Sequence, residues 1–454
     1  MSLRTLEIAR SAIMARQTEI ELIGHNVANA TTPGYARRRV SLASIPGEGS
    51  GTTLRSGRGV EVAAIQRMGD RLLEAQINVE TGNLGHDSVM ADAASNVESI
   101  TAGADGRGLL DPVNALFDAF ATVAGDPGAA TPRQNLIAQA QSMCDAFRRT
   151  ASSLRSALDA NDQQTVAAVQ QVNDLSTQVA ELNVQIGKSG GATKALDLVE
   201  QRGLALNELS KLCGASGVAG DNGQVDVLLG GQHLVQGDRV TALQADLVND
   251  TTPGLPKYHQ ITLGSETPPQ GLGGELAGYT DARSQQIKKA LTGLNDFAKS
   301  LADAINTQQQ AGYDLHGNPG AALLTYDPNG PAASIQLNPA IAQDGTLIAA
   351  ASAPGEPGNG DNAVALENLR SSSHLVQGHT DFLSGIGSDV RLANARKDAR
   401  QAVTSALEAR YQESSGVSID EEALSLSEAQ KAYTAAERVA QVALQMMDDT
   451  LKLV

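Results

Sequence analysis

The stretch NVANATTPGYARRR, residues 26–39, decides where the first long helix of the chain ends. Thr32 precedes a proline, which disfavours helical backbone angles at the threonine. Pro33 fixes its own φ at about −65°, and Gly34 can adopt the positive φ that the third residue of a type II turn requires. The stretch therefore predicts a helix that stops before a tight turn, followed directly by a tyrosine and three arginines.

The thirty residues at the start of the chain carry apolar side chains at alternating spacings of three and four. This spacing is typical of one face of a coiled-coil helix, and only Arg16 interrupts it. The members of the stripe are Leu6, Ala9, Ile13, Ile20, Ile23, Val27 and Ala30.

The last thirty-five residues repeat this spacing, after an acidic run at the position where a helix would begin. Negative charge is favourable at a helix N-terminus, so Asp420, Glu421 and Glu422 suit that place. The stripe of this second predicted helix consists of Ala432, Ala436, Val439, Ala443, Met446, Thr450 and Leu453.

The two ends carry opposite net charge. Residues 1–40 contain six arginines against three glutamates, whereas residues 420–454 contain seven acidic against three basic residues. We therefore expect the two terminal helices to pair with each other. Because alanine fills much of both stripes, one pair buries little apolar surface, and full order would need many copies packed together. An ordinary amphipathic helix at each end of a globular fold is the alternative.

Between the ends the periodicity changes twice. Residues 82–212 are mostly helical in pattern, residues 215–263 read as short β-hairpins with turns at 221–223 and 230–231, and helical spacing returns after residue 275. The predicted fold is mainly α with an inserted β domain, elongated, with paired terminal coiled-coil helices. Its parts would be a terminal domain (1–40 and 414–454), a helical core (41–212, 275–313 and 363–413), a small β-rich domain (213–274) and a loop-rich connector (314–362).

Composition excludes several classes of protein. The net charge of −17 argues against binding to nucleic acid or to an anionic membrane. No stretch holds the ~20 apolar residues of a membrane-spanning helix, and the charged start is unlike a cleavable signal peptide. Cys144 and Cys213 lie far apart, in no spacing that indicates zinc or a disulfide framework.

No arrangement of residues predicts catalysis, a cofactor or a metal. GKSGG at 187–191 resembles a phosphate loop, but Leu182 stands where its first glycine belongs. His374 and His379 are five apart, off the spacing that places two metal ligands on one helix face, and we expect both to be exposed to solvent. Residues 314–318 alternate like a calcium loop, yet Thr325 replaces the glutamate at its twelfth position, so a turn is predicted.

Seven residues of the opening stretch carry a resemblance. In their order and place after a heptad helix they resemble the N-x-A-N-x-x-T-P-G-Y motif of the bacterial flagellar axial proteins, which are rod, hook and hook-associated proteins. The matching residues are Asn26, Ala28, Asn29, Thr32, Pro33, Gly34 and Tyr35.

The C-terminal sequence distinguishes one family among the axial proteins, because residues 414–451 resemble the end of the hook-associated protein 1 family. There S-G-V-x-x-D-E-E precedes a Q-x-A-Y-x-A-A-x-R-V helix. A central helix is similar to the family's D-L-x-x-Q-R-D-x-L-x-x-E-L, with Gly203 in place of the aspartate. The matches are Ser415, Gly416, Val417, Asp420, Glu421, Glu422, Gln430, Ala432, Tyr433, Ala435, Ala436, Arg438 and Val439 at the end, and Asp197, Leu198, Gln201, Arg202, Leu204, Glu208 and Leu209 in the centre.

The resemblance implies a structural protein of the flagellum, not an enzyme. Such a protein assembles in a ring on the distal end of the hook and meets hook protein, the second junction protein and the filament. It implies export through the flagellar type III apparatus without a cleaved signal, and a cytoplasmic chaperone at the C-terminal helix. The resemblance also implies that this chain lacks an outer β domain, which longer relatives insert before residues 348–352.

The assembly interface follows from the two stripes. The terminal helices would pack with neighbouring copies into an inner tube, and Tyr35 with Arg37, Arg38 and Arg39 would anchor the turn between tube and outer wall. The interface residues are Leu6, Ile13, Ile20, Ile23, Val27, Ala432, Ala436, Val439, Ala443, Met446 and Leu453. Alternatives are another axial protein of the hook or distal rod, a secreted peptidoglycan hydrolase, or an adhesin.

Overall fold

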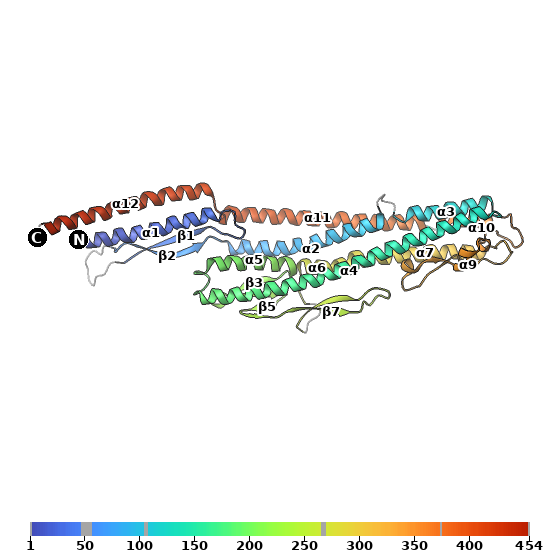
Figure 1. Ribbon diagram of the computed structural model, residues 1–454, viewed down its shortest axis with the longest axis horizontal. Helices are drawn as coiled ribbons and strands as arrows, with labels where there is room; N and C mark the ends of the chain where they lie inside the picture. Colours follow the sequence, from blue (N-terminus) through green and yellow to red (C-terminus); the bar gives the residue numbers. More distant parts are fainter. Residues whose placement is uncertain (1, 47–56, 104–107, 265–268, 373–374, 453–454) are drawn as a thin grey trace. The chain divides into compact units, whose positions relative to one another are not determined.

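The structure, a computed structural model, describes residues 2–46, 57–103, 108–264, 269–372 and 375–452. It is mainly helical with small inserted sheets, which confirms the predicted fold class (Figure 1). The longer helices are α1 (Ser2–Ala28), α2 (Arg71–Ala102), α3 (Leu110–Gly125), α4 (Ala130–Lys188), α5 (Leu196–Cys213), α6 (Gly274–Asp281), α7 (Lys289–Ala311), α10 (Asp361–Ser372), α11 (Leu375–Ser415) and α12 (Ile419–Lys452). A π-helical segment, Ala282–Lys288, joins α6 to α7, and α8 (Pro331–Ser334) and α9 (Pro339–Gln343) are short.

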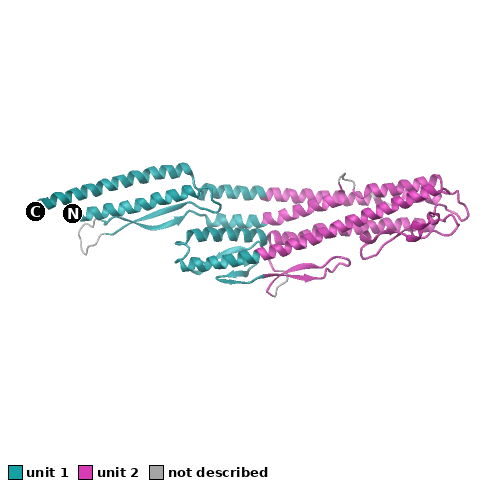
Figure 2. Ribbon diagram, in the orientation of Figure 1, with its two compact units in different colours: residues 1–82, 172–242, 401–454 teal, residues 83–171, 243–400 magenta. Residues whose placement is uncertain are grey.

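The strands are few and antiparallel. They are β1 (Arg38–Ser44), β2 (Val60–Arg67), β3 (Ser216–Ala219), β4 (Val225–Leu229), β5 (Gln232–Gln236), β6 (Arg239–Val240), β7 (Leu243–Val248), β8 (Tyr258–Leu263), β9 (Leu324–Thr325) and β10 (Gln336–Leu337). The chain forms two compact units (Figure 2). Unit 1 holds residues 1–82, 172–242 and 401–454, and unit 2 holds residues 83–171 and 243–400.

The two terminal helices pack against each other within unit 1, as their charges and stripes predict. They run in opposite directions, so the N- and C-termini lie at the same end of the pair (Figure 1). The residues of α12 that are buried lie seven apart, one per heptad. These are Glu422, Ala429, Ala436 and Ala443, and α1 buries Ala9, Ala15, Ile23 and Asn26.

The predicted stripe only partly coincides with this buried seam. Val439 and Met446 are 44% and 54% exposed, and Val27 of α1 is 42% exposed. Leu6, Ile13, Ile20 and Ala432 are half-buried. Leu453 lies outside the described residues. The pair therefore buries an alanine seam between its two helices and leaves larger apolar side chains on its flank.

A β-hairpin follows the helix stop, where the sequence predicted the start of a helical core. β1 and β2 pair from Arg38 opposite Arg67 to Ser44 opposite Val60, with a register shift between Ser41 and Leu42. The ribbon packs on α1. Every second residue of β2 up to Ala63 is exposed, the burial pattern of a strand with one covered face.

The predicted β-hairpins between residues 215 and 263 are present. β3, β4, β5 and β6 form one four-stranded sheet in unit 1, and β7 pairs with β8 in unit 2. Asn222 adopts φ 53° in the first predicted turn, and both glycines of the second have positive φ. Residues 213–274 thus hold two separate sheets, which fall in different units.

Unit 2 gathers the phenylalanines of the chain into its core. Phe117, Phe120 and Phe147 are fully buried, Phe297 is 9% exposed and Phe382 packs against the same cluster. With five phenylalanines in the whole sequence, all of them belong to this core.

The expectation that His379 is exposed to solvent is wrong. Its side chain is 1% exposed and stacks on Phe297, with ring centroids 4.6 Å apart. His374 lies outside the described residues. The loop at 314–318 is the predicted turn, in which Asp314 accepts hydrogen bonds from the backbone N–H groups of His316 and Asn318 at 2.8 Å.

Candidate functional site

The helix stop has the predicted turn geometry. The N–H of Tyr35 donates to the carbonyl of Thr32 at 3.2 Å, and Gly34 adopts φ 77°. A Cβ on Gly34 would lie 2.8 Å from Leu204 of α5, so the position favours glycine both by its backbone angle and by the space available. The turn directs the chain out of α1 and sends Tyr35 into unit 1, where it is 7% exposed.

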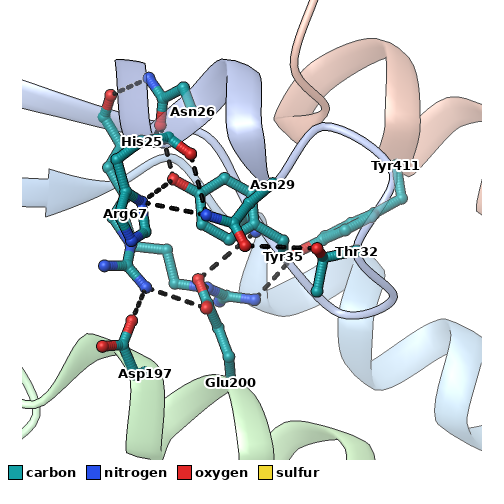
Figure 3. Close-up of polar contacts among 11 residues, drawn as sticks. His25, Asn26, Asn29, Thr32, Tyr35, Arg67, Asp197, Glu200 and Tyr411 are labelled. Atoms are coloured by element: carbon teal, nitrogen blue, oxygen red, sulfur yellow. Dashed lines mark hydrogen bonds and ion pairs between the residues drawn. The ribbon is translucent and has the colours of Figure 1, made fainter. Parts of the chain in front are cut away.

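Asn26 and Tyr35 form the centre of the site (Figure 3). The Tyr35 hydroxyl donates to Asn26 Oδ1 at 2.7 Å and lies 3.0 Å from His25 Nδ1. Burial raises the pKa of Tyr35 to about 12, which keeps the hydroxyl a donor. Asn26 Oδ1 also accepts the N–H of Arg38, while its Nδ2 donates to the Arg38 carbonyl at 2.9 Å and to Glu422 Oε2 at 3.1 Å. The amide therefore joins α1, β1 and α12.

Arg38 connects the turn to α5. Its guanidinium binds Asp197, and it reaches Glu200 Oε2 at 2.9 Å. It also lies 5.2 Å from the centre of the Tyr35 ring. Burial alone would lower the pKa of Arg38, but the hydrogen bonds and charges of the two carboxylates raise it above its ordinary value. The two carboxylates thus compensate the charge of the buried guanidinium, although its Nε has no hydrogen-bond partner among the described residues.

Arg37 holds the first turn of α12. Its NH1 lies 2.6 Å from Glu421 Oε2 and its Nε 2.7 Å from Glu422 Oε1. The Glu422 side chain is 2% exposed, whereas that of Glu421 is 64% exposed. The backbone N–H of Arg37 donates to the carbonyl of Ser415, the last residue of α11, at 2.9 Å. One residue therefore fixes both the end of α11 and the start of α12.

Arg67, at the end of β2, extends the contacts to α2 and α11. Its guanidinium lies 2.7 Å from Glu74 Oε1 and donates to the Tyr411 hydroxyl at 3.0 Å. Tyr411 in turn donates to Glu74 at 2.7 Å, and burial raises its pKa. Arg67 Nε also lies 3.9 Å from Glu200, which links this group to Arg38.

We call these connected side chains the Tyr35 network. They come from residues of unit 1 in seven elements, namely α1, β1, β2, α2, α5, α11 and α12, and in the turn between α1 and β1. The members are Asn26, Tyr35, Arg37, Arg38, Arg67, Glu74, Asp197, Glu200, Tyr411, Glu421 and Glu422. Residues from the N-terminal, central and C-terminal sequence motifs meet here. Their hydrogen bonds and ion pairs hold the helices in fixed positions.

The predicted site residues contribute unequally. Gly416 forms the bend between α11 and α12, where a Cβ would lie 2.3 Å from the Gln412 carbonyl. Ala28, Pro33 and Asp420 are exposed. Arg39, which the sequence placed with Tyr35 as an anchor, is also exposed and lies outside the Tyr35 network.

Four members of the network were missed from the sequence. They are Arg67, Glu74, Glu200 and Tyr411. Glu200 had the clearest signal, since it lies one helical turn after the motif residue Asp197 and therefore shares its helix face.

Within the described ranges, no group of three or more histidine, cysteine or acidic side chains is placed to hold a metal ion. Nor does any described helix combine the length and apolar character needed to cross a membrane. Both cysteines are buried and free, and burial raises the pKa of each to about 12.

Comparison with known proteins first defines the class. Residues 6–35 match the family of flagella basal body rod proteins, and residues 408–453 match the C-terminal family of the flagellar basal body rod proteins FlgEFG. These two segments hold most of α1, the end of α11 and all of α12, which are three of the helices that meet at the Tyr35 network. Residues 94–324, just over half of the chain, match the helical domain of the flagellar hook-associated protein FlgK. The chain therefore belongs to the flagellar hook-associated protein FlgK family.

Individual relatives agree with this assignment. Flagellar hook-associated protein 1 of Salmonella typhimurium is 28% identical over 323 residues, which are 69% of this chain and 57% of the relative. The chain thus spans a little over half the length of that relative. The protein of the same name from Bacillus subtilis is 24% identical and aligns over 98% of this chain and 97% of its own. Both relatives carry the name of a flagellar hook-associated protein, which is not the name of an enzyme.

A solved structure has the same fold. The flagellar hook junction protein FlgK from Burkholderia pseudomallei superposes with a TM-score of 0.65, at 17% sequence identity. The match covers 74% of this chain and 99% of that one.

Proposed function

We propose that this chain is a structural component of the bacterial flagellum that joins hook to filament. It assembles in a ring on the distal end of the hook and takes part in no catalysis. The observation that carries the proposal is the Tyr35 network, because residues of the N-terminal, central and C-terminal motifs of one flagellar family converge in it. Such a site positions the terminal helix pair relative to the rest of unit 1.

The terminal pair supplies the surface for self-assembly. Its alanine seam is already used between α1 and α12, so a neighbouring copy would meet the flank, where Val27, Val439 and Met446 are exposed. Exposed apolar side chains gain most from burial, at about 25 cal/mol per Å². The half-buried Leu6, Ile13 and Ile20 would complete the contact as copies pack around the inner tube.

The partners follow from this position. Beside further copies of the chain, they are hook protein on one side and the second junction protein with the filament on the other. Before export through the flagellar type III apparatus, a cytoplasmic chaperone would cover the C-terminal helix, whose exposed Leu424, Val442 and Leu444 need protection from water. No cleaved signal is required for this route.

Deletion of residues 420–454 tests the junction role. In cells that carry the deleted gene in place of the intact one, electron microscopy should show hooks without filaments and filament subunits in the medium. Re-introduction of the full chain should restore the filaments. Normal filaments on cells with the deletion would contradict the proposal.

A further inference from the structure

His379 occupies a core position of α11 that would suit an apolar residue. It lies on one face of the helix with three apolar side chains at spacings of four, three and four. These are Leu375 at 8% exposure, Phe382, half-buried, and Ile386 at 9%. All three pack in the core of unit 2 or against it. In its neutral form the imidazole serves there as one more aromatic ring.

The imidazole is enclosed by aromatic rings. It stacks on Phe297 of α7 at 4.6 Å with an interplanar angle of 8°, and the Phe382 ring lies 6.1 Å away on its own helix. Phe297 in turn contacts Phe147 of α4 at 5.4 Å. Among the described residues neither ring nitrogen has a hydrogen-bond partner. A protonated imidazole would therefore be a buried cation with two unsatisfied donors.

No neighbouring charge compensates a proton on this ring. Burial is the cause that lowers the pKa of His379, to about 4, and no charged group contributes to that shift. The charged residues of the helices packed around it lie at the surface or pair with one another. They are Asp296 and the pair Lys299–Asp303 on α7, Asp145 with Arg148 on α4, and Asp381 and the Lys289 partner Asp389 on α11. Glu98 of α2 is half-buried and faces the other end of the segment, where its Oε1 lies 3.5 Å from the position of a Cβ on Gly387.

The start of α11 depends on these contacts for its helical state. Its first thirteen residues include Gly378, Gly385 and Gly387, and glycine is among the poorest helix formers. Gly293 of α7 lets the Phe382 ring approach closely, since a Cβ there would lie 2.5 Å from that ring. A segment with weak intrinsic helix propensity stays helical mainly through its packing, so loss of a core contact weakens its helical state.

We propose that His379 is an acid-sensitive latch, which holds the first turns of α11 against α7 and releases them when its imidazole is protonated. Neutral His379 packs as an aromatic residue, and the segment 375–387 stays on the core of unit 2. The charged form is stable only in water, so protonation favours the open state of this segment.

The sign and size of the effect follow from linkage. The pKa of His379 lies below its ordinary 6.5 in the closed state, so closure is favoured at high pH and weakened as pH falls. The opening constant should rise by up to about tenfold per pH unit between pH ~6.5 and ~4, on the order of 100-fold between pH 7 and pH 4.

Hydrogen exchange of the full chain between pH 7 and 4, corrected for intrinsic rates, measures this constant for residues 375–387. The wild-type segment should lose protection on acidification while the α4 core keeps its own. His379→Phe should remove the pH dependence. If the His379→Phe protein does not fold, His379→Leu serves the same purpose. His233→Phe is the matched control, since this histidine of β5 has a 45% exposed side chain and should leave the wild-type slope intact.

Three results would overturn the latch. The first is a wild-type segment whose protection does not change between pH 6.5 and 4. The second is a pH dependence that survives in His379→Phe. The third is an equal loss of protection in α4, which would mean global acid unfolding instead of local release.

Discussion

At the scale of single residues, Gly34 shows why the helix stop has the sequence it has. Its φ of 77° is a conformation that costs other residues roughly 1–2 kcal/mol, and its Cα faces Leu204 at close range. The turn it permits is what brings Tyr35 to Asn26. A substitution here thus acts on the whole network through the backbone.

Gly34→Ala should lower the free energy of unfolding of unit 1 by about 1–3 kcal/mol, because both the positive φ and the contact with Leu204 become unfavourable. Denaturant unfolding measures the change. Gly24→Ala is the control. That glycine lies inside α1 with nothing within 4 Å of a Cβ, so the change should be stabilising, by about 0.5–1 kcal/mol. Equal destabilisation by both would argue against this explanation of the turn.

Tyr35 gives a prediction for alkaline pH. Its folded pKa of about 12 exceeds the ordinary 10, so the neutral hydroxyl favours the folded state. This contribution is complete below pH 10 and is lost as pH rises through 12, about 2–3 kcal/mol in total. Unfolding measured at pH 9 and pH 12 should show the loss in the wild type and a smaller one in Tyr35→Phe. An identical loss in that variant would assign the effect to other groups.

At the scale of elements, the polar contacts between α1 and α12 that the described residues make lie at the end near the turn. Farther along α1, Ser11 Oγ accepts the N–H of Val60 in β2 at 3.2 Å, which is a contact with the ribbon and not with α12. Arg37, Asn26 and Glu422 fix the end near the turn, whereas the far ends are joined through alanines such as Ala9 and Ala443. Small side chains bury little apolar area, so the far ends gain little from pairing in a single chain. We expect order to decrease along both helices away from the Tyr35 network.

Hydrogen exchange of the isolated chain should therefore be rapid in residues 3–15 and 436–452 and slower in residues 23–38 and 415–429. The core face of α4, where Phe147, Ala151 and Leu154 are fully buried, provides the protected reference. Strong protection up to the end of α12 would refute this prediction, and would mean that the alanine seam holds the pair without neighbouring copies.

The elements themselves follow from local signals in the sequence. Heptad spacing predicted α1 and α12, opposite charge predicted their pairing, and Thr32, Pro33 and Gly34 predicted the stop. The β1–β2 ribbon was missed, because Val40 and Leu42 offer only a short alternation after a basic run. Such a ribbon depends on α1 to cover one of its faces.

The network could be predicted only in part. Asn26, Tyr35, Glu421 and Glu422 belong to motifs, but which of them meet is decided by tertiary packing. In the sequence, Glu200 and Arg67 have the appearance of solvated surface charges. Their neighbours in the sequence do not show that Glu200 binds Arg38 or that Arg67 binds Tyr411. His379 did have a signal, because its spacing from Leu375 and Phe382 is that of a core position.

At the scale of the whole molecule, the two ends of the chain lie at the same end of the α1–α12 pair, and the Tyr35 network lies at the other end (Figure 1). α1 ends and α12 begins at the Tyr35 network, and we propose that the first 40 and the last 40 residues act together in assembly. The three family motifs, far apart in sequence, are the parts that this meeting requires. The central claim is therefore that the network positions the terminal pair for the junction between hook and filament.

Replacing Arg37 tests this claim most directly, with Arg39 as the matched control. Arg37→Met removes the ion pairs to Glu421 and Glu422, whereas Arg39→Met changes an exposed arginine outside the network. Both variants should be exported, and electron microscopy should show mostly bare hooks in Arg37→Met cells but filaments in Arg39→Met cells. Filaments retained equally by both variants would contradict the account.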